Sequence, residues 1–203
     1  MEAIVPFDLA QAAATVESAL LLPDTATTAY PVLIIMSGLP GSGKSYLSQR
    51  VAQQLPAVVI QSDQVRKVLF PHPDYSAEES ATVHRVCREV LGRLLRRGKR
   101  VVFDATNLVE FQREILYSLA EHCGAGLLIV RTVAPEEMIR KRLEQRRTNG
   151  AELSDADWSV YRRMLKSEQQ IRRAHLNVDT TQPVDEVVRK IVRAARRCST
   201  VSL

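Results

Sequence analysis

The sequence predicts an α/β fold in which helices cover a parallel sheet of about five strands. Short apolar runs alternate with stretches whose apolar residues recur at helical spacing, a pattern typical of βαβ units. A glycine-rich turn also follows the first apolar run and opens a helical stretch. With 203 residues, the chain is long enough for one such domain and too short for two typical ones.

The first four predicted strands are short and mostly apolar runs, as expected for strands that are buried on both faces, whereas the fifth mixes apolar and polar residues. The predicted strands cover residues 32–36, 57–61, 101–103, 127–130 and 175–178. Since each strand is separated from the next by a helical stretch, we expect right-handed crossovers and a parallel sheet.

The helical stretches between these strands end or begin at recognisable residues. They cover residues 7–22, 44–55, 77–97, 109–122, 135–147, 155–175 and 184–197. Gly98 follows the third helix, Pro135 stands near the first turn of the fifth, and Ser154 is the expected N-cap of the sixth. The first helix is expected to dock on the domain, which divides the chain into an N-terminal helix with its connector (1–30) and a main domain (31–203).

The composition excludes several classes of protein. No apolar run approaches the ~18 residues of a membrane span, and the N-terminus lacks the basic cluster of a signal peptide. The three cysteines are scattered without CxxC spacing, which favours reduced thiols in a cytoplasm. The four histidines show no metal-ligand spacing, so no structural metal is expected.

The positive charge is concentrated in the C-terminal third. The formal net charge is +5, and residues 140–197 carry +7 while the rest of the chain carries −2. A basic surface of this kind is able to bind a polyanion such as nucleic acid, or only a triphosphate. The alternative is a set of solvated, arginine-rich helix faces.

The strongest motif is the sequence GLPGSGKS at residues 38–45, which matches GxxxxGK[ST] in full between a strand and a helix. In such a phosphate-binding loop (P-loop), successive backbone N–H groups point at phosphate oxygens. Lys44 is expected to reach the β- and γ-phosphates, and Ser45 to ligate Mg²⁺. The predicted ATP-binding residues are Gly38, Pro40, Gly41, Ser42, Gly43, Lys44, Ser45, Tyr46 and, from a later segment, Arg146.

Two further carboxylates fit phosphoryl transfer. Asp104 ends the third strand beside the P-loop, which is where a second partner of Mg²⁺ is expected, unless it only caps the next turn. Asp63 and Arg66 are three residues apart and share a helical face. A carboxylate there is able to accept the proton of an acceptor hydroxyl, and a cation beside it to hold an anionic group. The structural alternative is an N-capping Asp63 with a surface Arg66.

The segments GLPGSGKS, SDQVRK and VVFDATNL, in that order, resemble the phosphotransferases that include phage-type polynucleotide kinase, chloramphenicol phosphotransferase and, more distantly, zeta toxins. The resemblance covers roughly residues 32–175. It implies a three-layer P-loop kinase fold with strand order 2-3-1-4-5. It also implies that Asp63 is the general base, that Arg66 contacts an acceptor phosphate, and that Asp104 arranges the acceptor or the metal shell. Polynucleotide kinases commonly read Asp-Thr-Asn at this place, whereas this chain has Ala105 between the Asp and the Thr.

Residues 140–155 resemble the arginine-rich lid of the same group. The resemblance implies that a lid arginine closes on the phosphates, and Arg147 matches best, with Arg146 as a close competitor. Arg142 is expected to steady the lid helix, and the turn at residues 148–150 to let the lid move.

The pair Trp158 and Tyr161 lies just beyond the lid. These side chains face the same way, so they either stack on a base or sugar or pack against the core.

These features favour an ATP-dependent kinase whose acceptor is the 5′-OH of a nucleic acid. The alternative enzyme is a small-molecule kinase that acts on an antibiotic, sugar or nucleotide-sugar hydroxyl. A zeta-type toxin is less favoured, because those proteins generally carry Lys where this chain has Arg66. A nucleotide-dependent switch without an acceptor is the alternative from another class. The oligomeric state is left open.

Overall fold

The computed structural model of the protein describes residues 7–20, 27–149 and 156–198. A parallel sheet of five strands forms its centre, in the order β2-β3-β1-β4-β5. The strands are β1 (Val32–Ser37), β2 (Val58–Gln61), β3 (Val101–Asp104), β4 (Gly126–Val133) and β5 (Leu176–Asp179). Both the fold class and the strand order expected from the sequence are confirmed.

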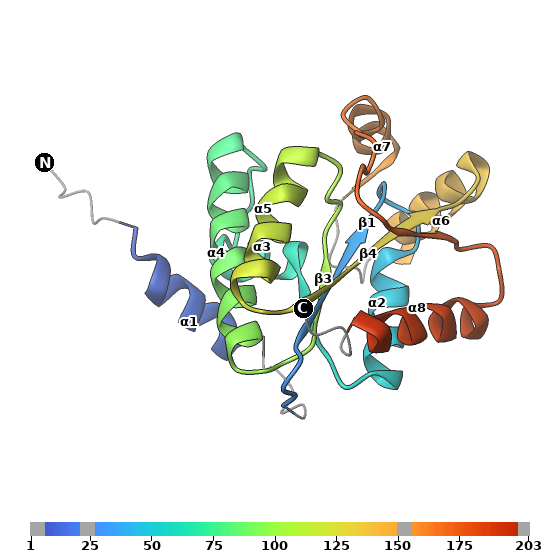
Figure 1. The fold of residues 1–203 in the computed structure, drawn as a ribbon. Coiled ribbons are helices and arrows are strands. Elements are labelled where there is room, and N and C mark those ends of the chain that lie inside the picture. The colour runs from blue at the N-terminus through green and yellow to red at the C-terminus, as the bar shows by residue number, and fades with distance from the viewer. Residues whose placement is uncertain (1–6, 21–26, 150–155, 199–203) are drawn as a thin grey trace, which may run out of the picture.

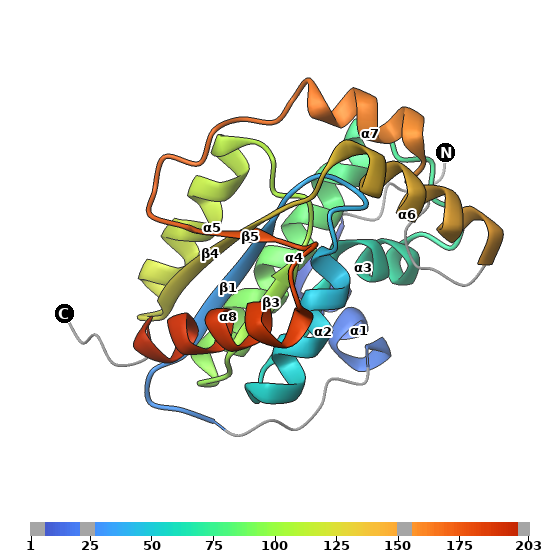
Figure 2. The same cartoon turned by 90° about the vertical axis from the view of Figure 1, so that its right-hand side faces the viewer.

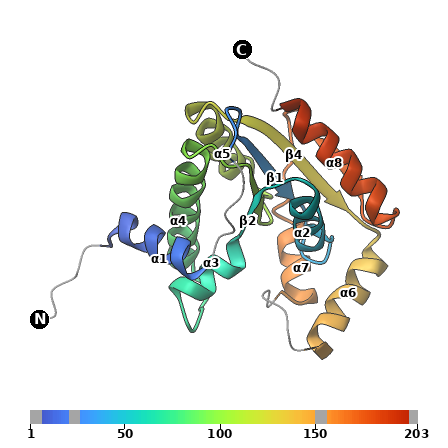
Figure 3. The ribbon, with the colours of Figure 1, turned by 90° about the horizontal axis from the view of Figure 1, so that it is seen from below.

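Helices cover both faces of the sheet, so the fold has three layers (Figure 3). One face is covered by α3 (Ser62–Leu69), α4 (Ala77–Arg96) and α5 (Glu110–His122), and α1 (Leu9–Ala19) packs against α4 and α3. The other face is covered by α2 (Lys44–Gln54) and α8 (Val184–Cys198). The residues of β1 alternate between the two cores: Leu33 and Ile35 face the first, while Val32, Ile34 and Met36 face the second.

Two helices, α6 (Glu136–Asn149) and α7 (Trp158–Leu165), lie over the carboxyl ends of the strands (Figures 1 and 2). A third apolar cluster packs them against the loops that follow β1 and β3. Its buried members are Leu39, Leu108, Ile139, Leu143 and Tyr161. The expected lid therefore contains a helix that is seated on the P-loop; residues 150–155 of the lid lie outside the described residues.

The N-terminal helix α1 docks on α4, as expected. Asp8 caps it by accepting hydrogen bonds from the N–H groups of Ala10 and Gln11 at 2.9 and 3.0 Å. Glu17 forms ion pairs with Arg93 and Arg97 of α4, at 3.5 and 2.7 Å. The division of the chain at residue 30 stays a prediction.

The expectation of a helix over residues 155–175 is wrong. Helix α7 ends at Leu165, and its N-cap is Asp157, whose carboxylate accepts a hydrogen bond from the Val160 N–H at 2.9 Å; the expected cap, Ser154, lies outside the described residues. After α7 the Gln169 N–H donates to the Leu108 carbonyl at 3.0 Å, and Ile171 is buried in the first core. These tertiary contacts replace the hydrogen bonds that a longer helix would make.

Candidate functional site

The P-loop joins β1 to α2. At Gly38 and Gly41 its backbone lies so close to neighbouring residues that only glycine fits. A Cβ atom on Gly38 would lie 2.5 Å from the Thr132 Oγ1 atom of β4. At Gly41 the backbone has a φ of +79°, and a Cβ atom would lie 2.9 Å from the Ile139 Cγ2 atom of α6. The lid helix thus rests directly on the loop.

Lys44 is buried and lies among the carboxylates of the site. Its Nζ donates a hydrogen bond to the Leu39 carbonyl at 2.9 Å, so the side chain folds back over the P-loop. Burial lowers the pKa of Lys44 from 10.5 to about 8, while Asp104 and then Asp63 raise it and Arg146 lowers it further. The structure therefore brings Lys44 together with Asp63, Asp104 and Arg146, which the sequence had nominated separately.

Asp104 ends β3 next to Gln61, the last residue of β2, and is buried. One carboxylate oxygen accepts a hydrogen bond from the Gln61 amide at 3.0 Å. Ser45 is half-buried in the first turn of α2. Both oxygen-bearing side chains thus sit at the carboxyl edge of the sheet, where open α/β folds bind ligands.

The loop after β3 is fastened to the start of the P-loop. Asn107 adopts a left-handed φ of +45° and donates from its amide to the Met36 carbonyl at 2.7 Å. The Ser37 hydroxyl donates to the Asn107 carbonyl at 3.1 Å, and the Gly38 N–H donates to the Thr106 carbonyl at 3.0 Å. These bonds fix Asp104 relative to the P-loop.

A cavity of about 280 Å³ opens beside the P-loop between α2, α6 and the loop that links β5 to α8. Its wall combines apolar side chains with amides and guanidinium groups, as is usual for pockets that bind organic ligands. The lining residues are Gly43, Tyr46, Leu47, Arg142, Gln145, Arg146, Thr180, Gln182, Val184 and Val187.

The three lid arginines are placed differently. Arg142 does more than steady its helix: its guanidinium donates to the Gly41 carbonyl at 3.3 Å and to the Thr180 hydroxyl and carbonyl at 2.9 and 3.0 Å. It thereby ties α6 to the P-loop and to the end of β5. Arg146 lines the cavity, whereas the side chain of Arg147 lies outside the described part of the structure.

On the acceptor side, Asp63 and Arg66 lie on α3 and are both half-buried. The guanidinium of Arg66 forms an ion pair with Glu79, donates to the Ser80 hydroxyl at 3.2 Å, and lies 4.9 Å from the centre of the Tyr75 ring. Only 12% of the Arg66 side chain is exposed. The structural alternative, a surface Arg66, is therefore not what the structure has, and Arg66 joins α3 to α4; its contact with an acceptor phosphate stays a prediction.

Trp158 and Tyr161 stack on each other, with ring centres 4.7 Å apart and ring planes 12° apart. Tyr161 is buried in the lid cluster. The packing alternative therefore holds for Tyr161.

Three residues of the site carry no motif and are missing from the sequence predictions. Thr132 bonds to the Ser42 hydroxyl at 2.7 Å, and Thr180 receives Arg142. Arg113 of α5 is fully buried and donates to four carbonyls at 2.7–3.0 Å, those of residues 107, 108, 169 and 170. A helical arginine in a polar stretch gives no sign of this role, because two of its partners, the carbonyls of Gln169 and Gln170, lie 56 and 57 residues away in the chain.

Curated relatives match about two thirds of the chain. A curated relative, the UPF0200 protein of Aeropyrum pernix, is 31% identical over 144 residues, which cover 64% of this chain and 70% of that protein. The rat protein 6-phosphofructo-2-kinase/fructose-2,6-bisphosphatase 1 is 25% identical over 144 residues; the match spans 63% of this chain but only 31% of that protein.

Solved structures of kinases share the fold. APS kinase CysC from Mycobacterium tuberculosis, in complex with AMPPNP and APS, gives a TM-score of 0.64 at 19% identity and covers 82% of this chain and 98% of its own. A gluconokinase from Sinorhizobium meliloti 1021 gives 0.60 at 22% identity, with 84% and 94% covered.

These matches do not confirm the narrower resemblance to polynucleotide kinase, chloramphenicol phosphotransferase and zeta toxins. At the level of the family the assignment is direct, since the family AAA_33, described as an AAA domain, matches residues 33–171. The chain belongs to the AAA_33 family.

Proposed function

We propose that this protein is an ATP-dependent phosphotransferase that moves the γ-phosphate of Mg·ATP to a hydroxyl group. The observation that carries the proposal is the grouping of Lys44 with Asp63 and Asp104 at the carboxyl edge of the sheet, under the lid helix. A lysine for the phosphates, a carboxylate for the metal and a second carboxylate for a proton are the parts that the reaction requires.

The donor site fits ATP and Mg²⁺. The P-loop N–H groups and Lys44 would hold the phosphates. The cavity beside the loop, whose lining includes Tyr46, Gln145 and Gln182, would hold the nucleoside. Mg²⁺ usually takes one or two carboxylates together with phosphate oxygens and waters. The Ser45 hydroxyl and the Asp104 carboxylate match that need. The metal would supply neutralisation of the charge that develops on the phosphates.

Asp63 is the candidate general base for the acceptor hydroxyl. Its carboxylate would take the proton of the acceptor hydroxyl as the oxygen forms a bond to the γ-phosphorus and the bond to the ADP oxygen breaks. Arg146 and Arg147 of the lid are the candidates to stabilise the transferring phosphoryl group. We infer that Arg66, held by Glu79, positions α3 and with it Asp63.

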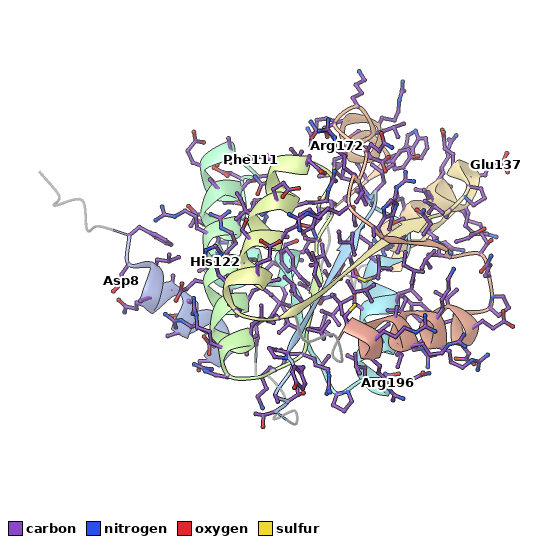
Figure 4. The ribbon with its side chains drawn as sticks, in the orientation of Figure 1. Asp8, Phe111, His122, Glu137, Arg172 and Arg196 are labelled. Atoms are coloured by element: carbon purple, nitrogen blue, oxygen red, sulfur yellow. The ribbon has the colours of Figure 1, made fainter. Side chains whose placement is uncertain are left out.

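The acceptor that this arrangement favours is a small molecule. The expectation of a nucleic acid rested partly on the basic C-terminal third. Yet Arg196 projects from α8, on the face of the sheet opposite to α3 and α4 (Figure 4). Arg131 and Arg173 are paired with Glu168 and with Glu114 and Glu121. These three arginines therefore give no support for a basic track toward Asp63. The 5′-OH of a nucleic acid remains the second candidate, because Asp63-x-x-Arg66 resembles the polynucleotide kinase motif.

Transfer of labelled γ-phosphate from Mg·ATP to a panel of acceptors tests the proposal. The panel holds sugars, sugar acids, sugar phosphates, nucleosides, aminoglycosides, chloramphenicol and 5′-OH oligonucleotides. We expect label on a small molecule, and a loss of about a hundredfold or more in the Asp63→Asn variant with unchanged ATP affinity. The exposed Asp185→Asn on α8 is the matched control.

Label on oligonucleotides alone would favour the second candidate instead. Loss of ATP binding in Asp63→Asn would mean that the residue is structural. Turnover of ATP with no labelled acceptor would favour a nucleotide-dependent switch.

A further inference from the structure

A second group of basic side chains lies on the acceptor side, outside the residues assigned above. His84 and Arg88 stand one turn apart on α4. Together with Phe103 of β3 and with Asn107, Gln112 and Leu116 they line a small hollow beside the carboxyl end of β3. The hollow has room for about one water molecule, about 10 Å³, so only a small group would enter it.

His84 and Arg88 lack the acidic partners that several other buried or half-buried basic side chains have. Arg66 is paired with Glu79, Arg93 with Glu89, and Arg113 with Glu110. Within the described residues, neither His84 nor Arg88 forms an ion pair or a hydrogen bond. Burial lowers the pKa of Arg88, and the neighbouring Arg85 lowers it further.

The same positive field acts on His84. Burial lowers the pKa of His84, and Arg88 and Arg66 lower it further. The lowered pKa favours the neutral form of His84, so the partly buried charge without a counter-charge is that of Arg88, and a bound anion removes its cost. Gln112 adds an amide that is able to donate to the same anion, and Phe103 and Leu116 give the hollow an apolar floor.

Charged residues of α3 act on residues around the hollow. Cys87 is buried on α4, and both Arg88 and Asp63 act on its thiol, whose pKa is raised to about 12 mainly by burial. Arg66, which shares α3 with Asp63, also acts on His84, so the hollow lies within electrostatic reach of α3. An acceptor whose anionic end lies at Arg88 would extend along α4 toward Asp63.

We propose that His84 and Arg88 form a subsite for an anionic group of the acceptor, so that the substrate class is a hydroxyl compound that carries a carboxylate or a phosphate. This inference rests on the proposed kinase function. It also assigns recognition of the anion to α4, while Arg66 keeps its contact with Glu79.

Paired acceptors that differ only in the anionic group provide the test. Gluconate is compared with glucose, and fructose 6-phosphate with fructose, so that the two arms separate a carboxylate from a phosphate. We expect kcat/KM to favour the anionic member of at least one pair. Arg88→Gln should reduce that preference by about ten- to a hundredfold, the effect of one charge-assisted hydrogen-bond partner. Arg88→Lys should retain part of it.

The matched control is Arg85→Gln, which removes the same charge from the same helix. Its side chain stacks on Phe7, 5.6 Å from the ring centre, and does not line the hollow. This variant should keep the preference. If Arg88→Gln fails to fold, judged by its unfolding temperature, His84→Gln takes its place. A preference for the neutral acceptors, or one that is unchanged in the Arg88 and His84 variants, would overturn the subsite.

Binding distinguishes failure of the subsite from failure of the proposed function. If no acceptor is phosphorylated, the kinase proposal fails, and the subsite is then tested by calorimetry with gluconate and fructose 6-phosphate on protein saturated with Mg·AMPPNP. Binding that weakens about tenfold or more in Arg88→Gln, but not in Arg85→Gln, would support an anion site without transfer. No binding, or equal binding to all variants, would overturn it.

Discussion

The donor and acceptor sides of the site are built in different ways. On the donor side, Lys44 donates to Leu39 within one local motif, and Arg142 of α6 adds a bond to the carbonyl of Gly41. On the acceptor side, α3 is held through one long side chain, Arg66, whose partners Tyr75, Glu79 and Ser80 come from the following segment. A local motif thus fixes the donor geometry, whereas tertiary packing fixes the acceptor geometry.

Lys44→Ala should give the largest effect and should act on the donor side alone. Without the lysine, the charge on the transferring phosphoryl group loses its nearest cation, and kcat should fall by about a hundred- to a thousandfold. Because the donor site is common to every reaction, the loss should be the same for all acceptors, as measured by transfer of labelled phosphate. The exposed Lys190→Ala should have no effect. A loss that differs between acceptors would break the separation of the two sides.

Glu79→Gln should act on the acceptor side. Glu79 is 5% exposed and holds Arg66, so its neutralisation leaves a nearly buried guanidinium without its counter-charge. We expect the free energy of unfolding to fall by about 3 kcal/mol. The KM for the acceptor should rise while the KM for ATP stays unchanged.

Urea denaturation and steady-state kinetics check this prediction, with the adjacent and exposed Glu78→Gln as the control. The control should change stability by no more than about 0.5 kcal/mol. A rise of the KM for ATP in Glu79→Gln would show that the two sides are coupled.

Gly41→Ala should show how closely the lid approaches the P-loop. A methyl group there adds strain at a φ of +79° and meets Ile139 and Leu143 at 2.9 and 3.1 Å. Gly124→Ala is a matched control, since it has a similar φ of +61° and nothing within 4 Å of the added atom.

Both variants should lose roughly 1–2 kcal/mol of stability from backbone strain. Only Gly41→Ala should also weaken ATP binding, by about tenfold, because the lid helix must move away from the loop. Equal ATP affinity in the two variants would contradict a lid that rests on Gly41.

The fold and the donor site were predictable from the sequence, because the apolar runs, the glycine spacing and Lys44 act locally. The short α7 was not, because Gln169 and Ile171 are held by residues far away in the chain. The partner of Arg66 was not predictable either, since Glu79 lies 13 residues away and only the packing of α3 on α4 brings them together. For the same reason, no motif marks His84 and Arg88.

The smallest expected effect is the pH dependence of stability that comes from Lys44, and it again tests the donor side. Because the pKa of Lys44 is lowered to about 8 while its usual value is 10.5, the folded protein binds fewer protons than the unfolded chain between these values. The contribution of Lys44 to the free energy of unfolding therefore rises with pH across that window and is constant below it. In Lys44→Ala this rise should be absent from urea denaturation curves.

Binding of ATP should reverse the shift, because phosphate oxygens favour the charged lysine and raise its pKa. At pH 8 about half of the Lys44 side chains are neutral, so binding should take up roughly half a proton. Calorimetry in buffers of different ionisation enthalpy measures this uptake, and Lys44→Ala gives the baseline to subtract. Asp185→Asn should match the unmodified protein. If the uptake at pH 8 were the same with and without Lys44, the lysine would not approach the phosphates, and the donor side would need another cation.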